Sequence, residues 1–152
     1  MSSSTTSTAS IQSLAADCRR ASRQVATLST ERKNRVLHAM ADALHDRTAA
    51  ILAANEKDVA GARADGLPDA MIDRLVLTEA RLQKMARALQ EVAGFADPVG
   101  KMSETTQRPS GIEVGQMRIP LGVIAMIYEA RPNVTSDAAG LCFKAGNAVF
   151  LR

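Results

Sequence analysis

Arg131 and Asn133 stand in a predicted turn that follows the apolar run Val123–Tyr128. A helix-like segment and a second apolar run, Ala148–Leu151, come next, so the pattern predicts a β-α-β unit with polar groups at the carboxyl end of its first strand. In open α/β sheets, substrates and cofactors bind outside the carboxyl ends of strands. The Arg131 guanidinium group either pairs with Glu129 or offers positive charge to a phosphate, and the sequence leaves both open.

The two apolar runs predict strands covered on both faces in a parallel sheet, because neither run alternates with polar residues. A helix is expected over Val134–Ala145, between the runs, and this is about the crossover length that parallel pairing needs. Ahead of the first run, Ile112–Ile119 has a weaker strand pattern. Pro120 cannot donate a ladder hydrogen bond, so it should mark a strand end or a bend.

Helices are expected through most of the chain before this unit. Apolar residues recur there at spacings of three and four, which is typical of one buried helix face. Ser10, Ser29 and Thr78 are expected to cap helix N-termini, while Gly66 and Gly94 are expected to end helices. The charged residues between Arg47 and Arg87 lie mostly opposite the apolar stripes, which indicates solvated helix faces.

The fold class is therefore α/β, with an N-terminal helical layer followed by the first β-α-β unit of a nucleotide-binding domain. Residues 1–10 are expected to be a disordered Ser/Thr-rich tail and 11–95 a helical region. The segment 96–111 contains two prolines and two glycines and is expected to be a linker loop. Residues 112–152 then begin the α/β domain, which we expect to be incomplete because two strands only start such a sheet.

Composition argues against several classes of function. Aromatic residues make up only 3% of the chain and its net charge of +3 is spread along it, so nucleic acid is not an expected partner. No apolar stretch approaches the roughly 20 residues that span a membrane. Cys18 and Cys142 are too few and too far apart for a disulfide framework or a metal site. We expect no metal and a reducing, cytoplasmic location.

Several segments, in matching order and spacing, resemble the gamma-glutamyl phosphate reductases, also called glutamate-5-semialdehyde dehydrogenases. This family is part of the aldehyde dehydrogenase superfamily, and the resemblance covers nearly everything after the Ser/Thr-rich tail. The segments are Leu52–Asp58 (LAANEKD), Asp73–Leu75 (DRL), Asp97–Gly100 (DPVG), Ile119–Ile124 (IPLGVI), Tyr128–Thr135 (YEARPNVT) and Lys144–Arg152 (KAGNAVFLR).

The resemblance implies a reaction in proline biosynthesis, in which NADPH reduces L-glutamyl 5-phosphate to L-glutamate 5-semialdehyde and phosphate. In this family a cysteine thiolate attacks the acyl phosphate, phosphate leaves, and hydride transfer to the thioester releases the aldehyde. The family's nucleophile belongs to a different segment from Cys142, so we expect it outside this chain and assign Cys142 to packing. The family also implies a homo-oligomer.

The resemblance further implies roles for four residues. Asn133 occupies the turn where the superfamily places an Asn whose side chain donates to the developing oxyanion, although Asn133 alternatively caps the following helix. Ile127, Tyr128 and Arg152 are implied to contact NADP. Arg152 stands where relatives have a ribose-contacting Lys, and its guanidinium group suits a 2′-phosphate. The alternative for Arg152 is an exposed terminal side chain.

Two other functions remain open at this point: a non-catalytic helical interaction module derived from an aldehyde dehydrogenase, and another reductase of the superfamily. The gene beyond Arg152 separates the module from the enzyme, because a continued α/β pattern with a Cys-containing motif favours the enzyme.

We predict that the polypeptide of residues 1–152 alone has no reductase activity, because it lacks the nucleophilic thiolate and has only part of a cofactor site. The measurement is NADPH oxidation by the purified polypeptide with L-glutamyl 5-phosphate. Turnover above the enzyme-free rate would contradict the prediction.

Overall fold

The computed structural model describes residues 11–129 and 131–152. The expected tail and the expected cap at Ser10 lie outside these residues. In chain order the elements are α1 (Ile11–Val25), α2 (Thr30–Asp46), α3 (Thr48–Ala64), α4 (Asp69–Leu75), α5 (Glu79–Gly94), β1 (Thr106–Gln107), β2 (Glu113–Val114), β3 (Val123–Met126), α6 (Pro132–Lys144) and β4 (Ala148–Leu151).

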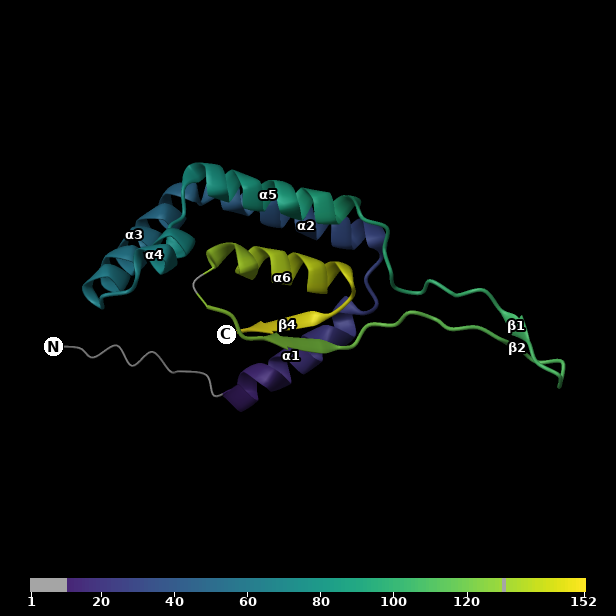
Figure 1. The fold of residues 1–152 in the computed structure, drawn as a ribbon. Helices are drawn as coiled ribbons and strands as arrows, with labels where there is room; N and C mark the ends of the chain where they lie inside the picture. Colours follow the sequence, from purple (N-terminus) through teal and green to yellow (C-terminus); the bar gives the residue numbers. More distant parts are fainter. Residues whose placement is uncertain (1–10, 130) are drawn as a thin grey trace.

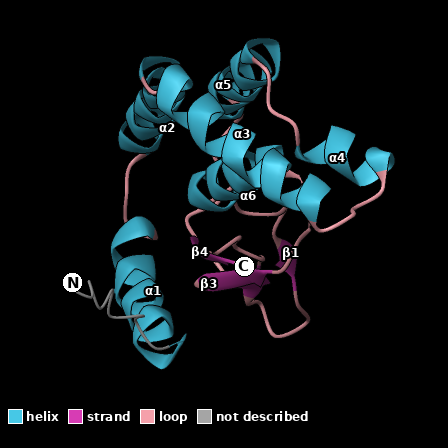
Figure 2. Ribbon diagram, turned by 90° about the vertical axis from the view of Figure 1, so that its left-hand side faces the viewer, coloured by secondary structure: helices cyan, strands magenta, loops and turns pink. Residues whose placement is uncertain are grey.

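The elements form layers around α6. Helices α2 and α5 lie side by side, α6 packs beneath both of them, and β3 and β4 lie on the far side of α6 (Figure 1). Helix α1 stands apart from the other helices and packs beside the strands, mainly against β4 (Figure 2). The predicted class, a helical layer followed by a β-α-β unit, is confirmed.

Two helices begin at the predicted caps. The side chain of Ser29 accepts a hydrogen bond from the Arg32 amide at 3.3 Å, and that of Thr78 accepts one from the Arg81 amide at 3.1 Å. Each hydroxyl oxygen satisfies an amide that has no partner inside its helix. Gly66, with φ of 74°, allows the chain to leave α3 in the left-handed conformation, as expected.

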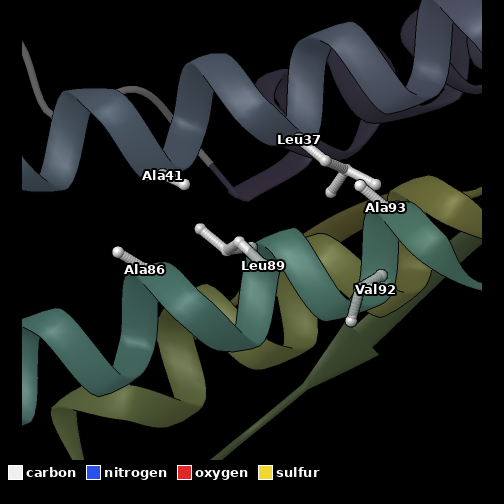
Figure 3. Close-up of a cluster of buried hydrophobic side chains, with 6 residues drawn as sticks. All are labelled: Leu37, Ala41, Ala86, Leu89, Val92 and Ala93. Carbon is white, nitrogen blue, oxygen red and sulfur yellow. The ribbon is translucent and has the colours of Figure 1, made fainter.

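The main apolar core lies between α2 and α5. Leu37 and Ala41 of α2 face the α5 side chains in Figure 3, and both are 0% exposed. The α5 members of the cluster are Ala86, Leu89, Val92 and Ala93. Three of the six cluster residues are alanine, whose small side chains allow a close approach of the two helices, and Phe143 of α6 packs against the cluster.

The β-α-β unit has the predicted parallel pairing. Val123 is in register with Ala148 and Met126 with Leu151. The crossover helix begins at Pro132 instead of Val134, because proline suits the first helical turn, where its missing N–H would have no partner. The first strand ends at Met126 instead of Tyr128.

The expectation that both strands are covered on both faces is wrong. Residues of β3 alternate between exposed and half-buried, and all residues of β4 are half-buried. Within the described part of the chain β3 and β4 form a two-stranded sheet, so each strand has an open edge. A continuous apolar run therefore identified the strands without predicting how deeply they are buried.

Helix α1 is also less buried than its apolar stripe predicts. Ile11 is 60% exposed and Leu14 is 40% exposed. The helix meets β4 near its centre, where the Cys18 thiol lies 3.8 Å from the Val149 carbonyl oxygen. Cys18 is half-buried and free, in agreement with a packing role.

The segment expected to be a linker loop is one arm of an extended ribbon that projects from the body (Figure 1). Thr106 and Gln107 form β1, which pairs antiparallel with β2, and a bridge joins Met102 to Met117. The expected strand over 112–119 is thus only two residues long. Whether a domain boundary lies here stays a prediction.

A buried ionic cluster joins α2 to the segment after α5. The Lys33 ammonium group, 1% exposed, lies 2.9 Å from a carboxylate oxygen of Asp97, which also accepts hydrogen bonds from the Thr30 hydroxyl and the Val99 amide. Burial would raise the pKa of Asp97, but the hydrogen bonds from Lys33, Val99 and Thr30 outweigh it, so the pKa lies below its usual value.

Lys144, at the end of α6, enters the same region. Its ammonium group donates to the Asn34 side chain at 2.5 Å and to the Ala93 carbonyl oxygen at 2.8 Å. The second contact satisfies a carbonyl at the C-terminus of α5. Burial lowers the pKa of Lys144. This side chain therefore fixes α6 against both α2 and α5.

Helix α6 comes close to α5 at Gly140, so we predict that Gly140→Ala destabilises the chain. A Cβ there would lie 2.7 Å from Cδ2 of Leu89, which is 1% exposed and has little room to move. The destabilisation from overpacking, about 1–3 kcal/mol, outweighs the stabilisation of roughly 1 kcal/mol from the higher helix propensity of alanine. Gly61→Ala is the matched control in α3, because nothing lies within 4 Å of its Cβ position. Denaturant unfolding should show a lower free energy of unfolding for Gly140→Ala and a higher one for Gly61→Ala. An equal increase for both variants would contradict the close approach of α6 to α5.

The ionic cluster predicts a pH dependence of stability. Because the folded-state pKa of Asp97 lies below its unfolded value near 3.8, its contribution is present above that pH and is lost as the pH falls through the folded pKa. Asp97→Asn should lower the unfolding free energy at neutral pH by about 3 kcal/mol, because Lys33 stays buried and charged. Unfolding midpoints measured from neutral pH to about pH 2 should fall less steeply for Asp97→Asn than for the parent. Parallel curves would contradict this assignment.

Candidate functional site

The carboxyl ends of β3 and β4 meet at one edge of the sheet. The Tyr128 amide donates to the Arg152 carbonyl oxygen at 2.9 Å, and the Arg152 amide donates to the Met126 carbonyl oxygen at 3.0 Å. The structure thus brings together Tyr128 and Arg152, two of the predicted cofactor residues. Ile127, the third, is 83% exposed next to them.

A tight turn at Gly146 and Asn147 sets the other end of the strands. Gly146 has φ of 79°, and a Cβ there would lie 2.7 Å from Cγ of Pro120. The Asn147 side chain accepts a hydrogen bond from the Gly122 amide at 2.9 Å. Two of the segments that carry the family resemblance therefore meet here and hold the strands in register.

The start of α6 places the remaining predicted residues beside the strand ends. Arg131 is the N-cap residue and Pro132 the first residue of the helix. The Tyr128 hydroxyl lies 2.5 Å from the Thr135 hydroxyl, which ties the end of β3 to the first turn of α6. Among the described residues, the Arg131 side chain forms no ion pair with Glu129, so that alternative is wrong.

Asn133 is the second residue of α6 and does not cap it, so the capping alternative is wrong. Its side-chain Nδ2 donates to a carboxylate oxygen of Asp137, one turn further along, at 3.0 Å. The amide of Asn133 has two N–H groups, so one remains for another acceptor. This geometry leaves Asn133 able to donate to an oxyanion.

A cavity of about 400 Å³ opens between the start of α6 and the junction of α4 and α5. This volume is in the range of small-molecule sites. Arg131, Pro132 and Leu77 also line a neighbouring cavity of about 370 Å³, which contains Tyr128. The first cavity is lined by Asp73, Arg74, Val76, Leu77, Arg81, Lys84, Met85, Ala88, Arg131, Pro132, Asn133 and Asp137.

The first cavity is predominantly positive. The Arg81 guanidinium group is already engaged: it donates to the Asp73 and Val76 carbonyl oxygens and lies 3.1 Å from the Asp73 carboxylate. The other three basic groups, Arg74, Lys84 and Arg131, form no side-chain hydrogen bond or ion pair within residues 11–129 and 131–152. Such a cavity can bind an anionic ligand.

Residues 73–77 form one wall of the first cavity, and the side chain of Asn55 in α3 holds their backbone in place. Its side chain donates to the Leu75 carbonyl oxygen at 2.9 Å and accepts from the Leu77 amide at 2.7 Å. Asn55 is 7% exposed, so these bonds satisfy backbone groups that have little access to water.

Five charged residues that line the cavity are not predicted as site residues by the sequence: Asp73, Arg74, Arg81, Lys84 and Asp137. The sequence pattern instead predicts solvated helix faces for the three basic residues, because it places them opposite the apolar stripes. Asp73 and Arg74 do fall in the DRL segment of the resemblance, which was the available signal. Their proximity to Asn133 depends on tertiary packing that periodicity does not describe.

Neither cysteine lies at this site. Cys142 is buried in α6, and burial raises the pKa of its thiol, which disfavours the reactive thiolate. The described residues include no group of three or more His, Cys, Asp or Glu that could hold a metal ion. None of their helices is long and apolar enough to cross a membrane.

Comparison with known sequences shows similarity along the whole chain. A gamma-glutamyl phosphate reductase from Salinibacter ruber is 68% identical over 152 residues, all of this chain and 35% of that protein. One from Xylella fastidiosa is 56% identical over 142 residues, covering 93% of this chain and 34% of that protein. The chain spans about a third of the length of these relatives. No family model matches it.

Solved structures agree with the sequence comparison. The crystal structure of gamma-glutamyl phosphate reductase from Thermotoga maritima matches with a TM-score of 0.86 and 37% identity, covering 91% of this chain and 33% of that one. The Saccharomyces cerevisiae enzyme matches with a TM-score of 0.88 and 34% identity, covering 95% of this chain and 37% of that one. In sequence and in fold, this chain is therefore similar to about a third of a gamma-glutamyl phosphate reductase.

Proposed function

We propose that the protein carrying this chain reduces L-glutamyl 5-phosphate to L-glutamate 5-semialdehyde and phosphate with NADPH, in proline biosynthesis. The observation that carries the proposal is 68% identity to a gamma-glutamyl phosphate reductase over the full chain. The positive cavity beside the strand ends supports it, because the substrate is an anion. We also propose a cytoplasmic location, which two free cysteines support.

Asn133 is the proposed donor to the oxyanion that forms when a thiolate attacks the acyl phosphate. One N–H group of its side-chain amide is held by Asp137, and the other is free to donate. A donor fixed before the reaction stabilises the developing charge without reorganisation. The attacking cysteine belongs to the part of the enzyme outside these residues.

Ile127, Tyr128 and Arg152 are the proposed NADP contacts. The open carboxyl edge of β3 and β4 fits a nucleotide cofactor, and the exposed Arg152 guanidinium group is suited to a 2′-phosphate. The bound cofactor supplies the hydride. Arg131 lies between the two cavities and is the proposed phosphate contact.

We further propose that the complete enzyme is a homo-oligomer and that the ribbon of residues 102–119 contributes to its contacts. Ile112 is 62% exposed, Met117 57% and Ile119 74%, so the ribbon presents apolar side chains to its surroundings. Contiguous exposed apolar surface is typical of interaction sites.

Asn133→Ala tests the proposed function in the complete protein. We expect kcat to fall by about a hundredfold or more while KM for NADPH is unchanged, because the amide contributes mainly in the transition state. The assay follows NADPH oxidation with L-glutamyl 5-phosphate, or NADP reduction with L-glutamate 5-semialdehyde and phosphate. Gln83→Ala is the control, since it removes an exposed amide of α5 that does not line the cavity.

A parent protein without turnover in either direction would overturn the proposed function. An active parent whose kcat is unaffected by Asn133→Ala would overturn only the role of Asn133.

A further inference from the structure

The first cavity has more charge than the chain itself neutralises. Arg81 and Asp73 form an ion pair on its wall. The remaining charged groups that line it are three basic side chains and one carboxylate, that of Asp137. Unbalanced charge in a cavity favours a ligand with the complementary set of charges.

The proposed substrate has that complementary set. L-glutamyl 5-phosphate has an α-carboxylate group and an acyl phosphate group of about −1.5 to −2 charge at neutral pH, which together match three cations. It also has one α-ammonium group, which matches one carboxylate. The match rests on the proposed function and extends it to the amino-acid end of the substrate.

The positions of Asn133 and Asp137 fit a glutamyl chain. The two side chains lie on successive turns of α6, and Asn133 Nδ2 is 3.0 Å from Asp137 Oδ2. The reacting carbon and the α-nitrogen of a glutamyl chain are about 5 Å apart when it is extended and closer when it bends, so one glutamyl chain can reach both groups. Lys84 of α5 lines the same cavity from the facing helix.

We propose that Asp137 binds the α-ammonium group of the substrate and that Lys84 binds its α-carboxylate group. Asp137 has an oxygen available for this contact, because within the described residues only its Oδ2 accepts a hydrogen bond, from Asn133. Lys84 is exposed to the cavity and has no side-chain partner among the same residues.

The contact between Asn133 and Asp137 makes the α-ammonium group a condition for efficient catalysis. A carboxylate beside the oxyanion donor repels the negative charge that develops on the reacting oxygen. The substrate's own ammonium group compensates that carboxylate, whereas a ligand without an ammonium group leaves it unbalanced. Selection against such ligands therefore comes from a repulsive group as well as from an attractive one.

The test uses the complete enzyme in the oxidative direction with three aldehydes. L-glutamate 5-semialdehyde has both groups, 5-oxopentanoate lacks the ammonium group, and 4-aminobutanal lacks the carboxylate group. The variants are Asp137→Asn and Lys84→Met. Their matched controls, Asp42→Asn and Lys57→Met, remove exposed charges of α2 and α3 that line neither cavity.

Asp137→Asn should lower kcat/KM for L-glutamate 5-semialdehyde by about tenfold to a hundredfold and should leave 5-oxopentanoate unchanged or improved. Lys84→Met should lower kcat/KM for L-glutamate 5-semialdehyde by a similar factor and leave 4-aminobutanal unchanged. The controls should behave as the parent. An equal fall on all aldehydes for Asp137→Asn would overturn the proposal, because it would mean that Asp137 only orients Asn133; an absence of any change would overturn it too.

A binding measurement keeps the proposal testable if the parent shows no turnover, which would contradict only the proposed function. Calorimetry compares L-glutamate with glutarate, which lacks the ammonium group. Tighter binding of L-glutamate that Asp137→Asn abolishes would support the subsite. Equal binding of the two compounds, or none, would overturn it.

Discussion

The burial of two lysine ammonium groups between the helices determines how the two parts of this chain fit together. Lys33 is compensated by Asp97, and Lys144 by the Asn34 side chain and the last turn of α5. An ammonium group without these partners would be strongly unfavourable at such depth. Helix α6 must therefore end where Lys144 reaches α5 and α2, which sets its axial position.

The site depends on that position. With its C-terminus fixed by Lys144 and its middle placed against Leu89 at Gly140, α6 presents its first turn to the junction of α4 and α5. Asn55 holds the opposite wall by bonding the backbone of Leu75 and Leu77. Buried polar groups that have no direct part in the proposed chemistry thereby determine the distance between Asn133 and the basic groups of α4 and α5.

Local sequence patterns are sufficient to predict where helices and strands form, but they do not predict how deeply these elements are buried. The hydroxyl caps at Ser29 and Thr78 and the parallel strands at 123 and 148 follow from short-range chemistry, and these were predicted correctly. The ribbon was not recognised, because pairs such as Met102 with Met117 join residues whose patterns are individually weak. For the site, the motif identified the turn at Asn133, whereas the cavity wall around Lys84 arises from packing of α5 on α6 and has no sequence period of its own.

The contact between Cys18 and Val149 joins residues that are 131 positions apart in the chain. It therefore affects when α1 can reach its folded position as well as where it lies. On a ribosome that adds about 5–20 residues per second, α1 is synthesised on the order of ten seconds before β4 exists. During that interval the face of α1 that packs on β4, which includes Cys18, has no strand to cover it. A contact so distant in sequence also lowers the folding rate, because a long loop must close before it forms. Helix α1 is therefore the element that a chaperone would have the longest opportunity to bind.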